Sequence, residues 1–173
     1  MRIRDAAEPD LTPITALENW AIRETPAHFA EQEMPVAEMV ALWEQTRGRF
    51  PWLVAEDNDG AFKGYARASA WKSRCAYRYS AEITVYVEPA HHRRGVGRAL
   101  YTELFARLDA AGYRTLIAGI TLPNDASVKL HEAMGMTKVA HFPRVGWKFG
   151  AWRDVGYWLL ELGDPDAPPR DVG

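Results

Sequence analysis

The sequence predicts an α/β fold in which helices cover the faces of a mixed sheet. Apolar residues repeat with a period of two in some segments and about 3.6 in others, which gives the element order β-α-α-β-β-β-α-β-α-β-β. With 173 residues, of which 47% are hydrophobic, the chain is long enough for one full core and too short for two comfortable ones. We therefore expect one domain over residues 1–162, followed by a disordered tail over residues 163–173.

The first part of the chain is expected to form one strand, two helices and a hairpin. Residues 2–6 read as a short strand, and apolar residues spaced three and four apart predict helices over residues 11–23 and 36–46. Residues 50–70 hold two strands around the turn sequence Asp-Asn-Asp-Gly, which predicts an antiparallel hairpin. The helix residues expected to face the core are Ile14, Leu17, Ala21, Met39, Val40 and Trp43.

A strand and a long helix follow the hairpin. Residues 80–88 alternate apolar and polar side chains, as a half-buried strand does. From Gly95 the period becomes helical, and Gly112 stands where a glycine ends a helix. The apolar stripe of this helix consists of Val96, Leu100, Leu104, Leu108 and Ala111.

The last part of the chain is expected to add three strands and a helix. Residues 113–122 read as a buried strand, and residues 124–135 as a helix that begins at an asparagine cap and stops at a glycine. Two more strands are expected near residues 136–142 and 154–162.

Composition and charge restrict the kind of partner. The formal net charge is −2 and the sequence pI is about 6.2, so a broad cationic face for nucleic acid is not expected, although a local basic pocket is compatible with these values. No apolar run approaches the ~20 residues that span a bilayer, and the charged N-terminus lacks the apolar core of a signal peptide. Cys75, the one cysteine, fits a reducing compartment. We expect a cytoplasmic protein without a membrane partner.

The segment His-His-Arg-Arg-Gly-Val-Gly, residues 91–97, joins the strand at 80–88 to the long helix. A helix N-terminus exposes unpaired N–H groups, and glycines let a phosphate approach the backbone. The spacing lacks the third glycine of a dinucleotide fingerprint and the Gly-Lys-Ser/Thr of a Walker loop. It fits the pattern Gln/Arg-x-x-Gly-x-Gly/Ala of a pyrophosphate cradle, with His92 in the Gln/Arg position. It also fits an arginine-decorated helix start with a tight turn.

Five further blocks, in chain order, extend this pattern into a family resemblance. They are FPWLVAE, AWKSRCAY, AEITVYV, LPNDASVKLHEAMGM and GWKFGAWRDVGYW. Together with the cradle they resemble the phosphinothricin and methionine sulfoximine branch of the GNAT acetyltransferases, over nearly all of residues 2–162. The resemblance implies a mostly antiparallel sheet with a splayed central strand pair and four main helices. It also implies a homodimer, acetyl-CoA as co-substrate and an antibiotic or herbicide resistance activity.

The resemblance assigns two catalytic residues, and acyl-transfer chemistry explains why they are needed. An α-amine is mostly protonated at pH 7, so a base must remove a proton before the amine attacks a thioester. Glu82 holds the family's position for that base, and partial burial there would raise its pKa. Without the resemblance, Glu82 is also interpreted as a polar residue on the solvated face of a strand. His131 holds the position of the group that protonates the leaving thiolate. Its alternatives are a hydrogen bond to the cofactor, or a structural helix histidine.

The resemblance also assigns cofactor contacts. In the family, splaying of the central strands frees main-chain groups for the oxyanion and the pantetheine chain, here around residues 85–87, and the Val85 amide is the expected oxyanion donor. Asn124 is expected both to cap its helix and to contact the pantetheine arm. The expected cofactor-binding residues are Val85, Tyr86, Val87, Arg93, Arg94, Gly95, Val96, Gly97, Arg98, Asn124 and Ser127.

An acceptor with an α-carboxylate and a second anionic group calls for cationic and aromatic neighbours. The loop before the strand at 80–88 supplies such residues, and the family's substrate contacts come from this loop, with an aromatic wall from the loop after the first helix. Each residue by itself is more often a solvated surface residue. The expected acceptor-binding residues are Phe29, Lys72, Arg74, Tyr77, Arg78 and Thr84. The histidines lack metal-ligand spacing, so we expect no metal.

The sequence therefore predicts direct transfer of an acetyl group from acetyl-CoA to the α-amine of a small amino acid analogue. Within the same fold, the alternatives are other amines, such as a protein N-terminus, a polyamine or an aminoglycoside. From another class, the alternative is a non-catalytic acyl-CoA sensor. A dimer interface is expected at an aromatic C-terminal segment, whose residues would otherwise belong to the core: Trp147, Phe149, Trp152, Tyr157 and Trp158.

Overall fold

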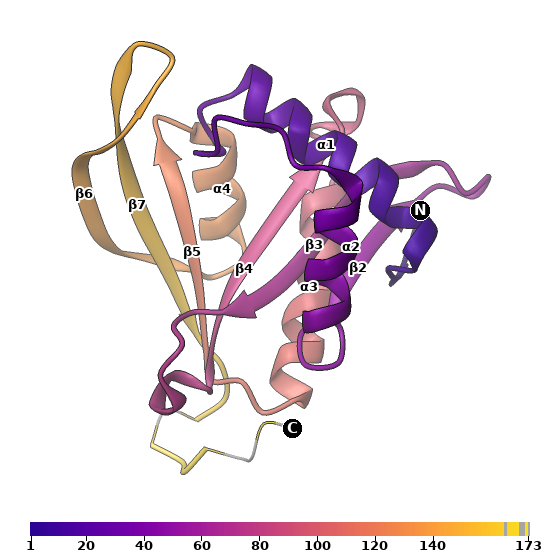
Figure 1. The fold of residues 1–173 in the computed structure, drawn as a ribbon. Coiled ribbons are helices and arrows are strands. Elements are labelled where there is room, and N and C mark those ends of the chain that lie inside the picture. Colours follow the sequence, from indigo (N-terminus) through magenta and orange to yellow (C-terminus); the bar gives the residue numbers. More distant parts are fainter. Residues whose placement is uncertain (165, 170–171, 173) are drawn as a thin grey trace.

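The computed structural model describes residues 1–164, 166–169 and 172. Within these residues the chain forms one seven-stranded sheet and four α-helices (Figure 1), in the order that the sequence predicts. The elements are β1 (Arg2–Asp5), α1 (Leu11–Glu24), α2 (Val36–Thr46), β2 (Trp52–Glu56), β3 (Phe62–Ala70), β4 (Ser80–Val87), α3 (Val96–Ala110), β5 (Thr115–Leu122), α4 (Asp125–Ala133), β6 (Thr137–Lys148) and β7 (Ala151–Glu161).

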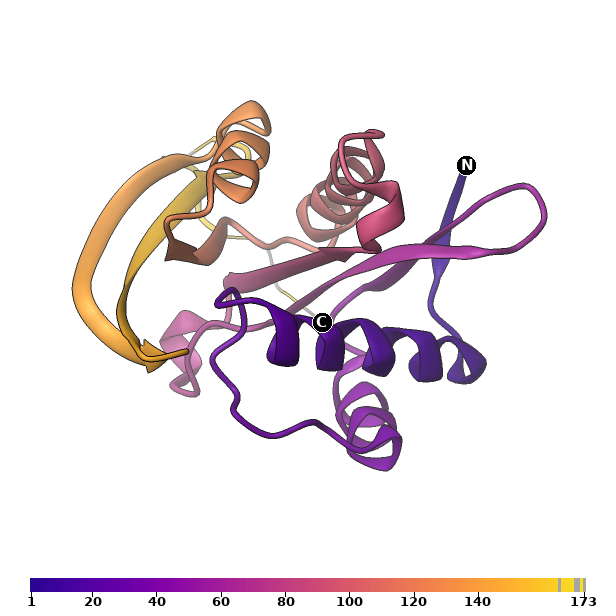
Figure 2. The same ribbon diagram turned by 90° about the horizontal axis from the view of Figure 1, so that it is seen from above.

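The strands are ordered β1-β2-β3-β4-β5-β7-β6, and their neighbours are antiparallel except for the central pair β4–β5. This confirms the predicted mostly antiparallel sheet. Viewed from above, α1 and α2 cover one face of the sheet, and α3 and α4 lie on the other (Figure 2). The crossover from β4 to the parallel β5 runs through α3, because parallel neighbours need a long connection across the face of a sheet.

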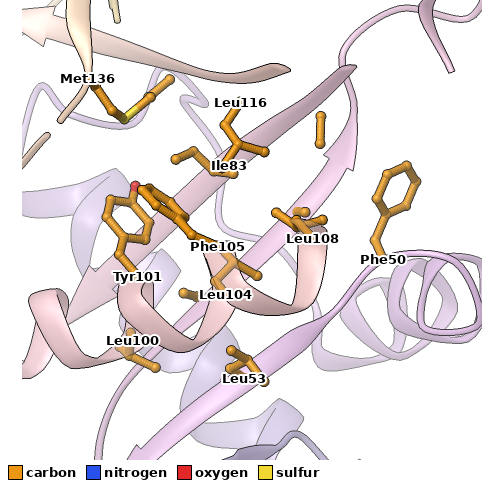
Figure 3. Packing of buried hydrophobic residues seen from close by; sticks show 14 of the residues in the cluster. Phe50, Leu53, Ile83, Leu100, Tyr101, Leu104, Phe105, Leu108, Leu116 and Met136 are labelled. Atoms are coloured by element: carbon orange, nitrogen blue, oxygen red, sulfur yellow. The ribbon is translucent and has the colours of Figure 1, made fainter. Parts of the chain in front are cut away.

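Each face of the sheet has its own apolar layer, because successive strand residues point to opposite faces. On one face, the leucine stripe of α3 packs on β2–β5, with Tyr101 and Phe105 beside it (Figure 3). Leu104, for example, is fully buried and contributes roughly 2 kcal/mol. On the other face, α1 and α2 pack on Trp52, Val54 and Tyr65. The sheet is therefore held from both sides.

The central strand pair separates after three paired positions. Ser80 pairs with Thr115, Ala81 with Leu116, and Glu82 with Ile117. Beyond Glu82, β4 runs to Val87 and β5 to Leu122 with no further pairing between them, so the two strands diverge (Figure 1). The splayed pair is thus confirmed, and it begins at the residue expected to be the base.

The C-terminal strands are longer than predicted. β6 and β7 form one long hairpin that turns at Phe149 and Gly150, both with positive φ. The alternation of apolar and polar residues is weak in β6, because this strand carries Pro143 and two register irregularities. Its place at the edge of the sheet allows both. The expectation of a disordered tail stays a prediction, since residues 165, 170, 171 and 173 lie outside the described residues.

Candidate active site

A cleft of about 1080 Å³ opens where β4 and β5 diverge. The first part of α3 and most of α4 form one side, and the end of α1 with the residues after it forms another. A cavity of this size accommodates an extended cofactor together with a small acceptor. Its walls include residues 82–87, 95–98, 119–121 and 123–127.

The N-terminus of α3 has the features of an anion site. Gly95 precedes the helix with φ 80°, and a Cβ at this position would meet no atom within 4 Å, so the backbone is open to the cleft. Among the described residues, no side chain caps α3, which leaves its first N–H groups for a ligand. Arg93, Arg98 and Lys129 also line the cleft. The site therefore fits a pyrophosphate.

His92 does not act as a substitute phosphate ligand through its Nε2. That atom donates a hydrogen bond to the main-chain carbonyl of Val87, 2.9 Å away, and so ties the cradle to the end of β4. The ring also makes an edge contact with Trp20, at 6.5 Å between ring centroids. His92 thus braces the cradle loop, a role that its position in the motif did not reveal.

Ten of the eleven predicted cofactor residues line the cleft. Arg94 is the one that does not; it is exposed in the turn before α3, next to Arg93, which has a positive φ of 59°. Asn124 caps α4 as predicted, because its side-chain oxygen accepts a hydrogen bond from the Ser127 N–H at 3.2 Å.

Glu82 lies on the wall of the cleft at the point where the strands part. Partial burial raises the pKa of its carboxyl group above the ordinary value, although the positive charges of Arg67 and Lys72 oppose the shift. Thr84 and Tyr86 share its side of β4 and also line the cleft. A carboxylate with a raised pKa in a cleft is suited to accept a proton near neutral pH.

His131 is almost completely buried and is held from two sides. Its Nδ1 donates to the main-chain carbonyl of Ser127 at 2.8 Å, so Nε2 is left to accept the hydroxyl hydrogen of Tyr101, 2.9 Å away. Both His131 and Tyr101 line the cleft. Burial lowers the pKa of His131, while the bond to Ser127 opposes the shift. The ring is therefore neutral at pH 7.

The predicted acceptor residues are only partly brought together. Thr84 lines the cleft, and Lys72 is near enough to Glu82 to influence its pKa. Arg74, Tyr77 and Arg78 do not line the cleft and are exposed.

This exposed loop makes contacts within itself. Residues Cys75–Tyr77 form a short 3-10 helix, and Arg78 stacks on Tyr79 and donates to the carbonyl of Cys75. Phe29 likewise lies off the cleft wall, with its ring against Gly146 of β6.

Sequence reasoning missed several residues of the cleft. Tyr101 belongs to no motif in the sequence, and only packing against α4 makes it the partner of His131. The end of α1 carries no recognisable motif, so its wall residues went unpredicted. Lys129, on α4, is far from the cradle in the sequence, and only the fold brings it to the same cleft. The missed wall residues include Trp20, Ala21, Thr25, Pro26, Ala27, Tyr101, Gly119, Ile120, Thr121 and Lys129.

Two further observations concern ligands and membranes. Among the described residues, no three His, Cys, Asp or Glu side chains come together as a metal site. None of the described helices is long and apolar enough to cross a membrane.

Comparison with known proteins identifies the same family along most of the chain. Residues 14–136 match the family model described as Acetyltransferase (GNAT) family. The chain is 40% identical to a phosphinothricin N-acetyltransferase of Streptomyces viridochromogenes, over 99% of this chain and 93% of that protein. It is 38% identical to the L-methionine sulfoximine/L-methionine sulfone acetyltransferase of Salmonella typhimurium, over 97% and 98%.

Among solved structures, the fold is similar to that of a GNAT superfamily phosphinothricin acetyltransferase from Sinorhizobium meliloti in complex with acetyl-CoA. The TM-score is 0.95 and the identity 34%, over 98% of this chain and 93% of that one.

The raised pKa of Glu82 predicts a pH-dependent effect of Glu82→Gln on stability. Between the ordinary value of 4.5 and the folded-state value, the folded protein binds more protons than the unfolded chain, so stability falls as the pH rises through this window. Glutamine stays neutral. We expect Glu82→Gln to unfold at a higher temperature than the wild type at pH 8, with a difference that shrinks toward pH 4.5, measured by circular dichroism.

Glu161→Gln, which removes an exposed carboxylate at the end of β7, is the control for the loss of one negative charge. Equal unfolding temperatures for Glu82→Gln and the wild type at pH 8 would contradict the raised pKa.

Proposed function

The chain belongs to the acetyltransferase (GNAT) family, and it is an acetyl-CoA-dependent N-acetyltransferase. From this premise we propose that it acetylates the α-amine of a small amino acid analogue of the phosphinothricin or methionine sulfoximine type. The names of the relatives support the choice of acceptor. The observation that carries the mechanism is the position of Glu82, half-buried where β4 and β5 part, on the same cleft as the N-terminus of α3.

The cradle holds the donor. Acetyl-CoA supplies the acetyl group as a thioester, and its pyrophosphate is the anion that the site fits. The open backbone at Gly95 and the free N–H groups of α3 bind the phosphates, with charge from Arg93 and Arg98. The main chain of residues 85–87 and Asn124 hold the pantetheine arm along the diverging strands.

Glu82 is the base. It removes a proton from the ammonium group of the acceptor. Because its pKa is raised, Glu82 is a stronger base than a fully solvated carboxylate. The free amine then attacks the thioester carbonyl directly, with no acetylated enzyme group in between. The exposed Cys75 is outside the cleft and takes no part.

The oxyanion and the leaving thiolate meet different groups. The Val85 amide, on the part of β4 that β5 does not pair, donates to the oxyanion. The Tyr101 hydroxyl, which donates to His131 Nε2 in this structure, stabilises the thiolate by turning to donate its hydrogen to the sulfur instead. Because burial keeps His131 neutral, hydrogen bonding is favoured over direct proton donation from this ring.

The acceptor lies on the Glu82 side of β4. Thr84 faces it from the strand, and Lys72 supplies the nearest positive charge of the loop before β4. Arg67 is paired with Glu18, so Lys72 is the positive charge near Glu82 that would repel a cationic polyamine and attract the carboxylate of an amino acid analogue. The charge near Glu82 therefore supports an anionic acceptor. An exposed, unpaired Cys75 fits the cytoplasm as the compartment.

We also propose a homodimer formed through the β6–β7 hairpin. Of the predicted aromatic segment, Trp158 is core at 1% exposure, whereas Trp147, Phe149 and Trp152 are 54%, 54% and 58% exposed. Phe142 and Val145 add exposed apolar area on the same hairpin. Large exposed apolar side chains gathered on one element mark an interaction surface.

The first test of function is a thiol-release assay with acetyl-CoA. We expect turnover of phosphinothricin or methionine sulfoximine, and a loss in kcat of about 100-fold to 10,000-fold in Glu82→Gln, because the base is gone. Glu161→Gln is the charge control and should keep wild-type kcat. Turnover of a polyamine with none of either analogue would overturn the acceptor assignment, and full activity of Glu82→Gln across pH would remove its role as base.

The second test concerns the cradle. Gly95→Asp places a carboxylate at the expected pyrophosphate site and should raise the Kd for acetyl-CoA at least ~10-fold, or about 1.4 kcal/mol. Gly60→Asp is a matched control, because Gly60 has a similar φ of 81° and equally open surroundings in the β2–β3 turn. Isothermal titration calorimetry measures both. Unchanged affinity in folded Gly95→Asp would contradict the cradle.

The third test concerns the dimer. Trp152→Lys should halve the mass measured by sedimentation equilibrium, because it puts a charge into the apolar surface of the hairpin. Val36→Lys, an exposed apolar residue of α2, is the matched control and should leave the mass unchanged. A wild-type protein that sediments as a monomer at all concentrations would refute the homodimer.

A further inference from the structure

Lys148, the last residue of β6, is buried although it takes no part in the cleft wall. Its Nζ donates to three main-chain carbonyls: Ile22 at 2.7 Å, Ala30 at 3.1 Å, and His28. All three belong to the end of α1 or to the α1–α2 loop, residues 25–35 (Figure 2). Burial of an ammonium group costs free energy, and donation of all three of its hydrogens to carbonyls offsets that cost. The three hydrogen bonds join β6 to the end of α1 and to the α1–α2 loop.

From this contact we propose that Lys148 is a positioning residue that sets the α1–α2 loop as the acceptor-side wall of the cleft, and so controls affinity for the acceptor. This inference rests on the proposed function, because only that function makes the second substrate an amine acceptor. The contact between β6 and the loop stands without it.

The amino-acid sequence explains why the loop needs this lysine. In a helix, the carbonyl of Ile22 would accept from the N–H of residue 26, but residue 26 is a proline and has none. The last turn of α1 therefore presents an unpaired carbonyl, and Lys148 fills that need from another element. The positive charge also suits the negative end of the helix dipole.

A second contact joins the same strand to the same loop. The ring of Phe29 lies against Gly146 so closely that a Cβ at Gly146 would overlap with it. Glycine at this position lets the loop approach the main chain of β6. The far end of the loop is tied to α1, since Asn19 both donates to the carbonyl of Met34, at 3.0 Å, and accepts from its N–H, at 2.9 Å. The loop is thus held at both ends.

The loop reaches the reacting groups through short connections. Thr25, Pro26 and Ala27 line the cleft directly. The ring of His28 lies 6.3 Å from that of Tyr86, centroid to centroid, and Tyr86 shares a face of β4 with Glu82. The main-chain carbonyl of His28 is one of the three that Lys148 holds. A displacement of the loop therefore moves the part of the cleft wall next to the ring of Tyr86, on the side of β4 that carries Glu82. Among the described residues, no main-chain hydrogen bond joins the loop to the start of α3, at residues 95–98.

The test compares two variants on β6 that act on the loop differently. Lys148→Met keeps the apolar stem and removes the three hydrogen bonds. Gly146→Ala keeps Lys148 and pushes Phe29 away. In both we expect the KM for the acceptor to rise about 10-fold, with the KM for acetyl-CoA within twofold of wild type, because misplacement of the wall affects only one substrate. Lys138→Met, an exposed lysine of the same strand, is the control.

Hydrogen–deuterium exchange of the protein without substrates provides a readout that does not depend on activity. Residues 25–33 should exchange faster in Lys148→Met than in wild type or Lys138→Met, while α3 is unchanged. Unchanged exchange in the loop overturns the inference. So does an equal rise of both KM values, which would show a general loss of structure. A wild type that acetylates no amino acid analogue overturns the proposed function instead, and the exchange result is unaffected.

Discussion

The whole site depends on one interruption of hydrogen bonding, the end of pairing between β4 and β5 at Glu82 and Ile117. Main-chain N–H and C=O groups that a sheet would normally satisfy are left facing a cleft. Such groups need a partner, and the pantetheine chain of acetyl-CoA is the partner that we propose. The same interruption places Glu82 where the opening begins, so the end of pairing creates the cleft and also sets the position of the carboxylate that we propose as the base.

The two faces of the sheet carry different polar features. The α3 face carries the leucine core and the open N-terminus of α3, which we propose as the phosphate site. The α1 face carries a buried polar cluster in which Glu18 accepts a hydrogen bond from Tyr65 and lies 3.9 Å from Arg67. Arg67 in turn acts on the pKa of Glu82. Burial thus raises the pKa of the Glu82 carboxyl group, and the nearby positive charge limits that rise.

Local sequence signals were sufficient to locate features that depend on a backbone conformation or on a helix cap. Gly95 with its positive φ, the Asn124 cap and the period-two alternation around Glu82 were all recognisable before folding. Recognition was incomplete where a contact depends on a distant neighbour, as between Tyr101 and His131. Arg74 and Arg78 stay predictions for the acceptor site, since both are exposed and neither lines the cleft.

The sequence by itself determined the order of elements and the position of the glycine-containing start of α3, because these follow from periodicity and from turn and cap chemistry within a few neighbours. The choice of Glu82 as the candidate base came from the family resemblance. Only the tertiary structure decided that Tyr101 meets His131, 30 residues away, and that Lys148 reaches Ile22, 126 residues away. The physical reason is that these contacts depend on how helices and strands pack, and a buried hydrogen bond between distant residues leaves no periodic trace in the chain.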